Sequence, residues 1–525
     1  MKRLFASALA FLAFLALLPA LAAAQTGPTL PANSVWGRMG VGPGPAQAIP
    51  FSVFHSAVSG PCATLTAGLV PATGGGTANF LRADCTFASP LPTILNNQIV
   101  ANVSGSTGPA AGATPTSIWD SFCSTTIGNF WVRMSSAWGC TSLGYANPVW
   151  WGCDPTGVVS CSSAFNSALA TNLPVRFPSG TFLLTSQISI AQSSYRSSTN
   201  ISGAGQNLTK LLWSNASGGI QISTSTSGST VPISAGTGSI SDLTLATNQV
   251  NGGTALRLQS SITTVGPTFS IRNVTIQGDD WEPYRGSAYW GIGFYTHLWS
   301  YVLLDNVTIN GRTALTVGGA ALGSAVVIEG DVASTQYVQS IKLTNSNFGS
   351  ANIAIELRDY WQGVLTDKTN TNGFFGCIYQ APGAAGTLAQ FSFINSICGS
   401  DGFGASIQSN INDMQVIGSN IIYGPPTGGQ GLSLGSSAGA MIVGNNIALV
   451  GSPVSNTAIN SAGAGAVITG NRIVSATTGV FLSGASSGAT VGLNSYNNVT
   501  NKIVNSGAGN SVGTQAAGNM AGVVP

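Results

Sequence analysis

The chain has 525 residues, of which 44% are hydrophobic and only 6% are charged, and its formal net charge is +2 at pH 7. So few charges, with no cluster of Lys and Arg to neutralise phosphates, exclude a nucleic-acid-binding surface. Frequent aliphatic and aromatic residues exclude a disordered chain, and 68 glycines favour many tight turns.

The first 24 residues are organised like a secretory signal. Two basic residues follow the initial Met, Leu4 to Leu18 is almost wholly apolar, and Ala22-Ala23-Ala24 forms a small-residue cleavage site. The alternative is an uncleaved membrane anchor, but Pro19 and the alanines interrupt such a span. No later segment is long and apolar enough for stable membrane insertion. We therefore expect a signal peptide over residues 1–24 and a secreted protein, extracellular or periplasmic.

The cysteines fit an oxidising compartment. They fall as four neighbouring couples with short separations, so we expect sequential pairing, although eight cysteines allow many other connectivities. The couples are Cys62 with Cys85, Cys123 with Cys140, Cys153 with Cys161, and Cys377 with Cys398. A zinc site is disfavoured because no CxxC motif occurs and the only histidines are His55 and His297. The sequence predicts no metal site and few or no free thiols.

Residues 25–147 are rich in Gly, Ala and Pro and contain a duplication. Within the segment 31–52, the stretch that begins at Asn33 recurs as 97–117, offset by 64 to 65 residues. This region resembles the short modules in the shafts and collars of phage tail-fibre and tail-spike proteins. The alternative is a glycine-rich secreted linker held by two disulfides, and the sequence leaves both open.

A short helix is predicted just after residue 160. Ser162 or Ser163 is a suitable N-cap, and Phe165 and Leu169 lie one turn apart on one face. An apolar face of this kind can plug the open end of a stacked solenoid.

Four motifs surround this helix. They are Cys153-Asp154-Pro155-Thr156-Gly157, the segment 161–169, the run 175–184 with its Pro-Ser-Gly-Thr turn, and Ile201-Ser202-Gly203-Ala204-Gly205. Together they resemble the opening of the pectate-lyase superfamily domain shared with rhamnogalacturonase-like and tail-spike proteins. Family members often carry a second aspartate before the helix, where this chain has Cys161, which would replace a polar bridge by a disulfide to Cys153. The resemblance covers residues 148–510 and implies an all-β, right-handed parallel β-helix, followed by a flexible tail at 511–525.

A repeat of short strands supports the same architecture. The last five of nine bend residues that precede an apolar strand are 23 to 26 residues apart, and the earlier intervals are longer, as when insertions leave a stacked solenoid from its loops. Asparagine tolerates a left-handed backbone, and its amide can bond the same amide one rung away. We expect one column of bend residues forming a buried polar ladder. The nine residues are Asp242, Asn273, Asn306, Asn345, Asn395, Ser419, Asn445, Asn471 and Asn494.

A second strand follows the bend in several rungs. Residues 255–258, 314–317 and 354–357 align without gaps, which would place Arg257, Thr316 and Glu356 in one outward column. Strands of adjacent rungs lie about 4.8 Å apart, so the members of such a column would touch.

The candidate working surface lies on the long rungs. Residues 242–401 hold 18 of the 32 charged residues, and eight aromatic residues lie between Trp281 and Tyr301. Flat rings beside carboxylates suit sugars, whose apolar faces stack on aromatic rings. Several of these rings could instead pack the inserted loop onto the barrel. The candidate substrate-binding residues are Trp281, Tyr284, Trp290, His297, Trp299, Arg312 and Arg358.

The candidate catalytic residues are Asp279, Asp280, Glu282, Glu356 and Asp359. The repeat alignment stacks Asp279 on Arg312, a contact that would hold the carboxylate ionised. A hydrolase needs two carboxyl groups about 5–5.5 Å or 6.5–9.5 Å apart, whereas a lyase would use calcium held by acids and a base such as Arg312 or Arg358. The alternative for the run from Glu356 to Asp359 is a solvated face with a local ion pair.

We therefore expect a secreted polysaccharide-active protein, a glycoside hydrolase or polysaccharide lyase acting on an acidic or complex polysaccharide. Polygalacturonase signatures are incomplete, because Gly278-Asp279-Asp280 is present but neither Gly-His-Gly nor Arg-Ile-Lys follows. The alternative is a non-catalytic glycan-binding surface protein or tail-like adhesin. The expected partner is a polysaccharide, a homotrimer is left open, and no cofactor is expected apart from Ca²⁺ if the protein is a lyase.

Overall fold

The computed structural model describes residues 143–513, except 193–197, 225–232, 235–237, 262, 266–267, 282–285, 313–322, 333–335, 381–389, 401–404, 409–411, 425–428 and 451–454. Outside 143–513 it describes only the backbone of a few short strands. The chain divides into two compact units, Met1–Thr125 and Thr126–Pro525. The expected signal peptide, the side chains of Cys62, Cys85, Cys123 and Cys140, and most of the expected tail lie outside the described residues.

Short antiparallel pairs come first in the chain. In the first unit β1 (Ser34–Gly37) pairs with β2 (Gln47–Pro50), and β3 (Ile99–Ala101) pairs with β4 (Ala111–Ala113). The two pairs occupy equivalent positions of the duplicated segment. The second unit begins with a hairpin of β5 (Asn129–Met134) and β6 (Ala137–Ser142).

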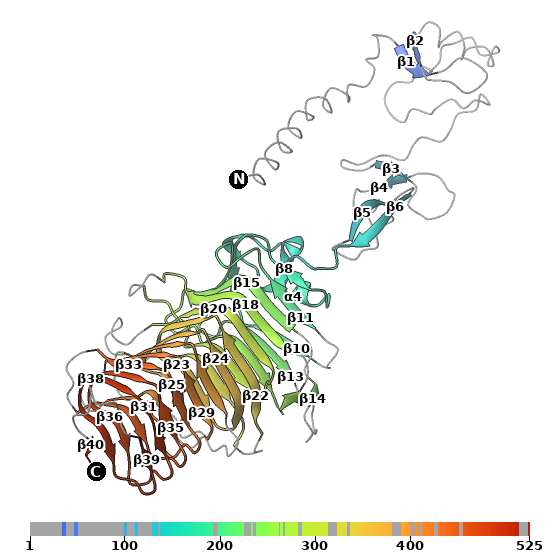
Figure 1. The fold of residues 1–525 in the computed structure, drawn as a ribbon. Coiled ribbons are helices and arrows are strands. Elements are labelled where there is room, and N and C mark those ends of the chain that lie inside the picture. The colour runs from blue at the N-terminus through green and yellow to red at the C-terminus, as the bar shows by residue number, and fades with distance from the viewer. Residues whose placement is uncertain are drawn as a thin grey trace, which may run out of the picture. The chain divides into compact units, whose positions relative to one another are not determined.

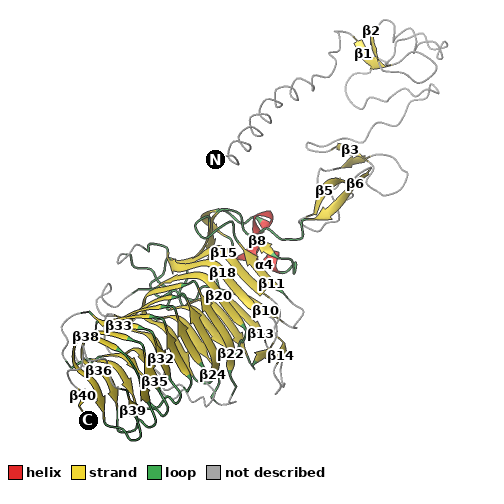
Figure 2. Ribbon diagram, in the orientation of Figure 1, coloured by secondary structure: helices red, strands yellow, loops and turns green. Residues whose placement is uncertain are grey.

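Apart from β14 and β17, the remaining strands form one continuous parallel array that runs along three faces of the solenoid, called sheets 1, 2 and 3 below, and the colours of Figure 1 show the rungs following one another in chain order (Figures 1 and 2). Sheet 1 contains β8 (Val175–Arg176), β11 (Thr199–Ser202), β15 (Gly238–Thr247), β18 (Phe269–Gly278), β20 (Val302–Asn310), β22 (Val338–Thr344), β24 (Trp361–Asp367), β26 (Phe391–Ile394), β29 (Met414–Ile417), β32 (Met441–Val443), β35 (Val467–Thr469), β37 (Thr490–Val491) and β39 (Ser511–Val512).

Sheet 2 contains β7 (Thr156–Ser160), β9 (Gly180–Leu184), β12 (Thr209–Trp213), the second halves of β15, β18 and β20, then β23 (Asn347–Arg358), β25 (Asn370–Gln380), β27 (Ile397–Ser400), β30 (Asn420–Tyr423), β33 (Asn446–Leu449), β36 (Arg472–Leu482) and β38 (Ser495–Asn505).

Sheet 3 contains β10 (Ile188–Gln192), β13 (Ile220–Thr224), β16 (Thr254–Ser260), β19 (Ile292–His297), β21 (Ser324–Glu329), the second halves of β23 and β25, β28 (Ala405–Gln408), β31 (Gln430–Ser433), β34 (Thr457–Ser461), the second halves of β36 and β38, and β40 (Val523–Val524). A small side pair joins β14 (Ile233–Ser234) to β17 (Thr264–Val265).

Alternation within each strand builds the core. In β12 and β13 the first, third and fifth residues are buried and those between them are half-buried, so aliphatic side chains of successive rungs stack inside the solenoid. The predicted all-β, right-handed parallel β-helix is confirmed. Among the described residues, no helix has the length and apolar character needed to span a bilayer.

A short helix closes the N-terminal end of the solenoid, as predicted. The 3-10 helix η1 (Pro148–Trp151) precedes α4 (Ser162–Leu169). Phe165 of α4 is fully buried and meets Phe177 edge-on with ring centroids 4.8 Å apart, and Phe177 in turn contacts Phe182 at 5.0 Å. These rings cover the first rung.

The predicted N-cap of α4 is wrong. Cys161 is the N-cap residue and makes no side-chain capping bond. The hydroxyl of Ser162 instead accepts the backbone N–H of Thr185 at 3.0 Å, which ties the helix to the first rung. The position of Cys161 is fixed by its disulfide to Cys153, which takes over the restraint that a cap would supply.

Two disulfides confirm two of the predicted sequential pairs. Cys153 pairs with Cys161, with Cα atoms 4.6 Å apart, and Cys377 pairs with Cys398 at 5.7 Å. No free cysteine occurs among the described residues. Both disulfides fit an oxidising compartment.

The bend residues form two neighbouring columns, so the prediction of one column is wrong. Asn273, Asn306 and Asn345 have left-handed backbones with φ of 52°, 54° and 50°, and they are exposed. In later rungs the left-handed residue is a glycine, and the predicted residue follows it and is buried, as in Gly444-Asn445. Glycine adopts a positive φ without a Cβ penalty, which frees the next position for an inward-pointing amide.

Both columns form hydrogen-bonded ladders. On the exposed column, the Nδ2 of Asn306 donates to the Oδ1 of Asn273 at 2.8 Å. On the buried column, the Oδ1 of Asn471 accepts from both the backbone N–H and the Nδ2 of Asn445 at 3.0 Å, and Asn494 does the same for Asn471 at 2.9 Å. The expected buried ladder therefore exists, but only in the later rungs.

The structure contains one rung that the sequence pattern did not predict. The register passes from Thr344 to Asp367 and then to Ile394, so the long interval between Asn345 and Asn395 holds a complete extra rung. Its bend residue is Lys368, with φ of 50°. The interval is therefore two ordinary rungs and not one lengthened rung.

Replacing Asn471 by Ala tests the buried ladder. The variant leaves the N–H of Asn445 and the carbonyl of Ile442 without their present partners, so the free energy of unfolding should fall by about 2–4 kcal/mol. The control is Asn446→Ala, which removes a half-exposed amide bonded to Asn420 and to the exposed Arg472 and should cost less than about 1 kcal/mol, because water can replace these partners. Urea unfolding measures both, and equal losses would contradict the buried ladder.

Asp154 organises the turn before the helix. Its carboxylate accepts hydrogen bonds from the backbone and hydroxyl of Thr156 and from the backbone N–H groups of Val158 and Val159. These bonds, the backbone N–H of Thr156 first among them, lower the pKa of Asp154 from 3.8 to about 2.

This lowered pKa predicts a pH-dependent contribution to stability. Because the folded-state pKa lies below the unfolded value, the stabilisation is present above about pH 4 and is lost as the pH falls toward about 2. Asp154→Asn should therefore melt at a lower temperature than the parent at neutral pH, and the difference should shrink across that window. Thermal melts followed by circular dichroism provide the measurement; a difference that is constant with pH would be inconsistent with this role.

Candidate functional site

The two aspartates after β18 are engaged in structural contacts. Asp279 forms an ion pair with Lys210 at 2.8 Å, not with Arg312 as the repeat alignment predicted, although the underlying match of Ile276 with Ile309 is correct. The turn carries the Asp279 side chain toward the preceding rungs, where Lys210 lies in β12.

Asp280 closes the inserted loop. Its carboxylate accepts hydrogen bonds from the backbone and hydroxyl of Ser287 and from the backbone N–H of Ala288 at 3.0 Å. Burial acts to raise the pKa of Asp280, but these bonds and the charge of Arg312 outweigh it and lower the pKa. An ionised, fully bonded carboxylate of this kind holds a loop and is a poor general acid.

Two of the four predicted sugar-stacking rings, Trp290 and Trp299, belong to the core. Trp299 is fully buried and packs edge-on against Phe269 at 6.0 Å. Trp290 is 5% exposed, donates its indole N–H to the carbonyl of Leu245 at 3.2 Å and packs against Trp213 at 5.7 Å. Their assignment as substrate platforms is incompatible with this burial. Trp281 is half-buried, and Glu282 and Tyr284 lie outside the described residues.

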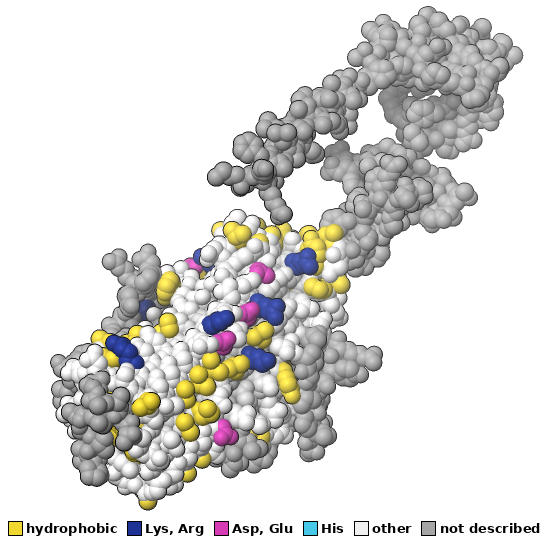
Figure 3. Space-filling view, in the orientation of Figure 1, with side chains coloured by type: hydrophobic (Ala, Val, Ile, Leu, Met, Phe, Trp, Pro, Cys, Tyr) yellow, Lys and Arg dark blue, Asp and Glu magenta, His cyan; other side chains and the backbone are white. Residues whose placement is uncertain are grey.

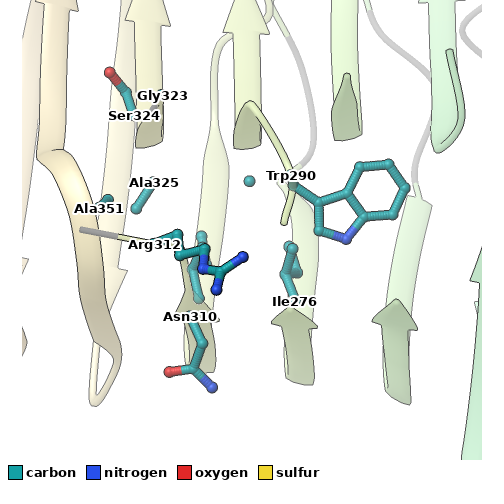
Figure 4. Close-up of a pocket in the computed structure, with 11 residues that line it drawn as sticks. Ile276, Trp290, Asn310, Arg312, Gly323, Ser324, Ala325 and Ala351 are labelled. Atoms are coloured by element: carbon teal, nitrogen blue, oxygen red, sulfur yellow. The ribbon is translucent and has the colours of Figure 1, made fainter. Parts of the chain in front are cut away.

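Arg312 points into a small pocket beside Trp290 (Figure 4). Ile276, Asn310 and Ser324 also line this pocket, and its volume of about 10 Å³ is room for about one water molecule and not for a sugar ring. The Nε atom of Arg312 is buried there without a hydrogen-bond partner among the described residues. The described residues around Arg312 therefore form a packed corner, and this pocket is too small for a saccharide.

A second group of predicted residues does come together, on the outer face of sheet 3. The register aligns Arg257 with Tyr295, then Val327, then Glu356. Next to it, Gln259 aligns with His297, Glu329 and Arg358 in the same rungs. The segment 314–317, predicted to supply Thr316 to the first column, lies outside the described residues, and Val327 occupies the position.

Arg358 is the centre of this group. Its Nε donates to Glu356 Oε1 at 2.8 Å, its second guanidinium nitrogen donates to Oε2 at 2.9 Å, and its Nη1 bonds Glu329 at 3.3 Å. Hydrogen bonding to Glu356 raises the pKa of Arg358, so the guanidinium stays protonated. Glu356 also accepts the hydroxyl hydrogen of Ser324, which lines the Arg312 pocket and so connects the two groups.

Tyr295 and His297 stand side by side along β19 with parallel rings 6.4 Å apart. The guanidinium of Arg257 covers the Tyr295 ring at 4.9 Å, a cation–π contact between rungs. Burial, followed by the charge of Glu329 and a hydrogen bond to it, raises the pKa of the Tyr295 hydroxyl. The phenol is therefore neutral at physiological pH and presents a hydrogen-bonding edge.

Asp359 completes the group at the end of β23. Its backbone is left-handed with φ of 53°, and its side chain is half-buried. Burial raises its pKa, and the negative charges of Glu329 and Asp331 raise it further, against partial opposition from Arg358 and His297. Asp359 is thus more easily kept protonated than a fully exposed aspartate.

We call Arg257, Tyr295, His297, Glu329, Glu356, Arg358 and Asp359 the sheet 3 cluster. Four of these residues are among the site residues predicted from the sequence. Arg257 was predicted only as part of the outward column, Tyr295 only as one of the eight aromatic residues, and Glu329 only as a possible member of an acid pair. One sequence signal could have identified Tyr295. Tyr295 and His297 are two residues apart, so both side chains lie on the same, outward side of one strand. No group of three or more His, Cys, Asp or Glu side chains suited to a metal occurs among the described residues.

The face of the solenoid shown in Figure 3 has a different character. Positive and negative side chains alternate over its middle, and hydrophobic side chains follow toward the C-terminal end (Figure 3). On sheet 1 the register passes from Arg272 to Asp305, and in later rungs from Ile394 to Ile417 and Val443. Charges of both signs are interleaved on this face, which gives it no single-sign surface for a charged polymer.

Comparison with known proteins adds no family assignment. No protein-family model matches the chain, and no curated protein matches it by sequence. Similar solved structures include DFA-IIIase from Arthrobacter chlorophenolicus A6 in complex with GF2, at 13% identity and TM-score 0.47, covering 67% of this chain and 94% of that one. The surface protein and adhesin PfbA of Streptococcus pneumoniae is 14% identical, with TM-score 0.46, 70% of this chain and 99% of that one.

A third similar structure is the mannuronan C-5 epimerase AlgE4 A-module of Azotobacter vinelandii, at 13% identity and TM-score 0.40, covering 70% of this chain and 100% of that one. At this level of similarity, the chemistry of this chain must be argued from its own residues.

The burial of Trp290 predicts the outcome of its replacement. Trp290→Ala should lower the free energy of unfolding by about 3–5 kcal/mol, as expected for a large ring removed from a packed core, whereas Trp281→Ala, at a half-buried position, should cost less than about 1.5 kcal/mol. Denaturant titration of both variants gives the two values. If Trp290→Ala left the stability unchanged, the assignment of this ring to the core would be wrong and a ligand-binding role would again be open.

Proposed function

We propose that this chain is a secreted polysaccharide-acting protein whose working surface is the sheet 3 cluster, with Asp359 as a general acid of glycoside hydrolysis. The observation that carries the proposal is geometric: the carboxylates of Glu329 and Glu356 converge on Arg358 on the outer face of sheet 3, and Asp359, whose pKa is raised, follows Arg358 at the strand end. Carboxyl pairs whose environments separate their protonation states are the usual arrangement for acid and base work on a glycosidic bond.

The other cluster members suit supporting roles. Arg358 bonds Glu329 and Glu356, which fixes the direction of both carboxylates. The Tyr295 hydroxyl and the imidazole of His297 are polar groups that could bond sugar hydroxyls. A glycosidic oxygen next to Asp359 would receive the proton as its bond to the anomeric carbon breaks, and a neighbouring carboxylate such as Glu329 would assist the attacking water or attack the anomeric carbon itself.

A lyase mechanism is less well supported by these residues. It needs a base that removes a proton from a sugar carbon, and the sequence offered Arg358 for that role. The raised pKa of Arg358 and its bidentate bond to Glu356 keep it protonated. The Tyr295 phenol, with its pKa raised as well, also binds its proton too tightly to act as that base.

A non-catalytic glycan-binding role is the second candidate. Glu356 is 11% exposed at its side chain and doubly bonded to Arg358, which fits a fixed binding surface as well as a catalytic one. The two candidates differ in one property: a binding protein retains its polymer and releases no product.

The test replaces Asp359 by Asn. Turnover of a hydrolysed polysaccharide, measured as new reducing ends, should fall by about 10² or more, as on loss of a general acid, while the melting temperature stays nearly unchanged. Asp413→Asn is the matched control, because Asp413 is also a left-handed aspartate, with φ of 56°, on a later rung outside the cluster; it should keep full activity. Unsaturated products in place of reducing ends alone would show a lyase, and full activity of Asp359→Asn would reject the assigned acid.

A charge substitution next to Asp359 tests its protonation state. A general acid works only while protonated, so activity should fall as the pH rises through the raised pKa of Asp359. Asp331 contributes to that raised pKa, so Asp331→Asn should move the alkaline limb of the pH–rate profile to lower pH without changing the maximum rate much. If the alkaline limb of the pH–rate profile did not move, a group other than Asp359 would determine it.

A further inference from the structure

Sheet 1 presents two neighbouring columns of outward side chains. Along one of them the register stacks Asp305, Thr344, Asp367, Ile394, Ile417 and Val443, which we call the Asp305 column. Two residues earlier on the strands from β22 to β35 it stacks Lys342, Leu365, Ser392, Gln415, Met441 and Val467, which we call the Lys342 column. Both columns carry charges in the earlier rungs and are mainly apolar in the later ones.

The later part of the two columns forms an exposed apolar strip that reaches from β24 to β35. No residue of the strip is buried, and Met441 has 39% of its surface exposed. Rungs about 4.8 Å apart make the strip about 19 Å long. Contiguous apolar surface that is left exposed marks a site of contact with another molecule. The strip consists of Leu365, Ile394, Ile417, Met441, Val443 and Val467.

The charged part of the two columns holds two residues of each sign. Arg272 precedes Asp305 in the same column, and Lys342 lies beside the position between Asp305 and Asp367. The hydrogen bonds to the two carboxylates come from side-chain amides and one hydroxyl, not from a cation. Lys342 is exposed and forms no ion pair within the part of the chain that the structure describes.

Further charges lie at the borders of the sheet. Asp242 and Lys368, one of each sign, occupy the left-handed corner that follows the Asp305 column, and Asp413 lies at the opposite border, before β29. These side chains flank the two columns. A contact over the columns themselves therefore depends on what faces Lys342 and the strip, and not on the net charge of the face.

The two columns are complementary to themselves under a two-fold rotation about an axis parallel to the solenoid. Each rung then faces the same rung of a second copy, and the Asp305 column of one copy faces the Lys342 column of the other. In the later rungs the apolar strip covers its own equivalent. In the earlier rungs the partner's Lys342 faces Thr344 and lies between Asp305 and Asp367, which stand one rung before and one rung after Thr344.

We propose that sheet 1 is the interface of a homodimer in which two solenoids lie side by side and parallel. One operation matches both halves of the face, since it pairs the strip with itself and Lys342 with two carboxylates. An antiparallel pairing centred on the charges would instead set the strip against Ser241 and Ser202 of the early rungs, which offer little apolar surface. The sheet 3 cluster lies on another face and stays open to its ligand.

Met441→Glu tests the apolar strip. The full chain should sediment as a dimer at micromolar concentration, and this variant, which places an unpaired charge in the interface, should weaken self-association at least about hundredfold. Its melting temperature at high dilution should stay nearly unchanged, because Met441 is 39% exposed in the single chain. Val450→Glu is the matched control: Val450 is apolar and 64% exposed but follows β33 of sheet 2, so this variant should remain dimeric.

Two charge changes test whether Lys342 bonds the partner or its own chain. Lys342→Glu and Asp367→Lys should each weaken self-association about tenfold, because like charges then face each other across the interface. Mixed in equal amounts, the two variants should form a heterodimer tighter than either homodimer, since the changed positions meet with opposite charge. No preference for the heterodimer, a monomeric or trimeric parent, or a dimer of undiminished affinity in Met441→Glu would each overturn the proposed interface.

Discussion

The structure depends on contacts between residues that occupy equivalent positions in successive rungs. Parallel strands about 4.8 Å apart force each side chain to have the equivalent side chains of the rungs before and after it as neighbours. Inside, this stacks aliphatic residues such as Leu245 and Ile276. Outside, it decides which charges meet, so Arg358 lies beside Glu329 because the two share a position in adjacent rungs. The charged network of sheet 3 is thus a product of register, assembled from residues distant in sequence.

The sequence predicted the architecture well because the solenoid repeats its own signals. Apolar alternation after each bend, short spacing in the later rungs and the motifs around α4 all pointed to one parallel β-helix. The missed rung at Lys368 shows the limit of reading bends by residue type. Several kinds of side chain can occupy a left-handed corner on an exposed edge, and lysine does so here. The corner residue itself also changes along the solenoid. Asn345 occupies the left-handed position in its rung, whereas Gly444 occupies it in a later rung and the asparagine, Asn445, follows at the next, buried position.

The candidate site was harder to predict, because chemistry depends on which way each residue points. A dense run of aromatic residues suggested sugar binding, yet Trp290 and Trp299 occupy inward positions and build the core. Asp280 was predicted to be catalytic because it lies in an acidic run. Its role is instead set by backbone N–H groups that bond its carboxylate, and sequence spacing does not reveal these contacts. Conversely, Glu356 and Arg358 were identified from the local run of charge alone. Their partner Tyr295 was passed over because the alignment assigned its column to residues 314–317.

The buried asparagine ladder has a direction. The backbone N–H of Ser419 is satisfied by Asn445, that of Asn445 by Asn471, and that of Asn471 by Asn494, so each rung is completed by its successor. A growing solenoid consequently carries one incomplete ladder step, at its tip, however many rungs lie behind it. The energetic cost of ending this ladder is therefore set by its last step and not by the number of rungs behind it.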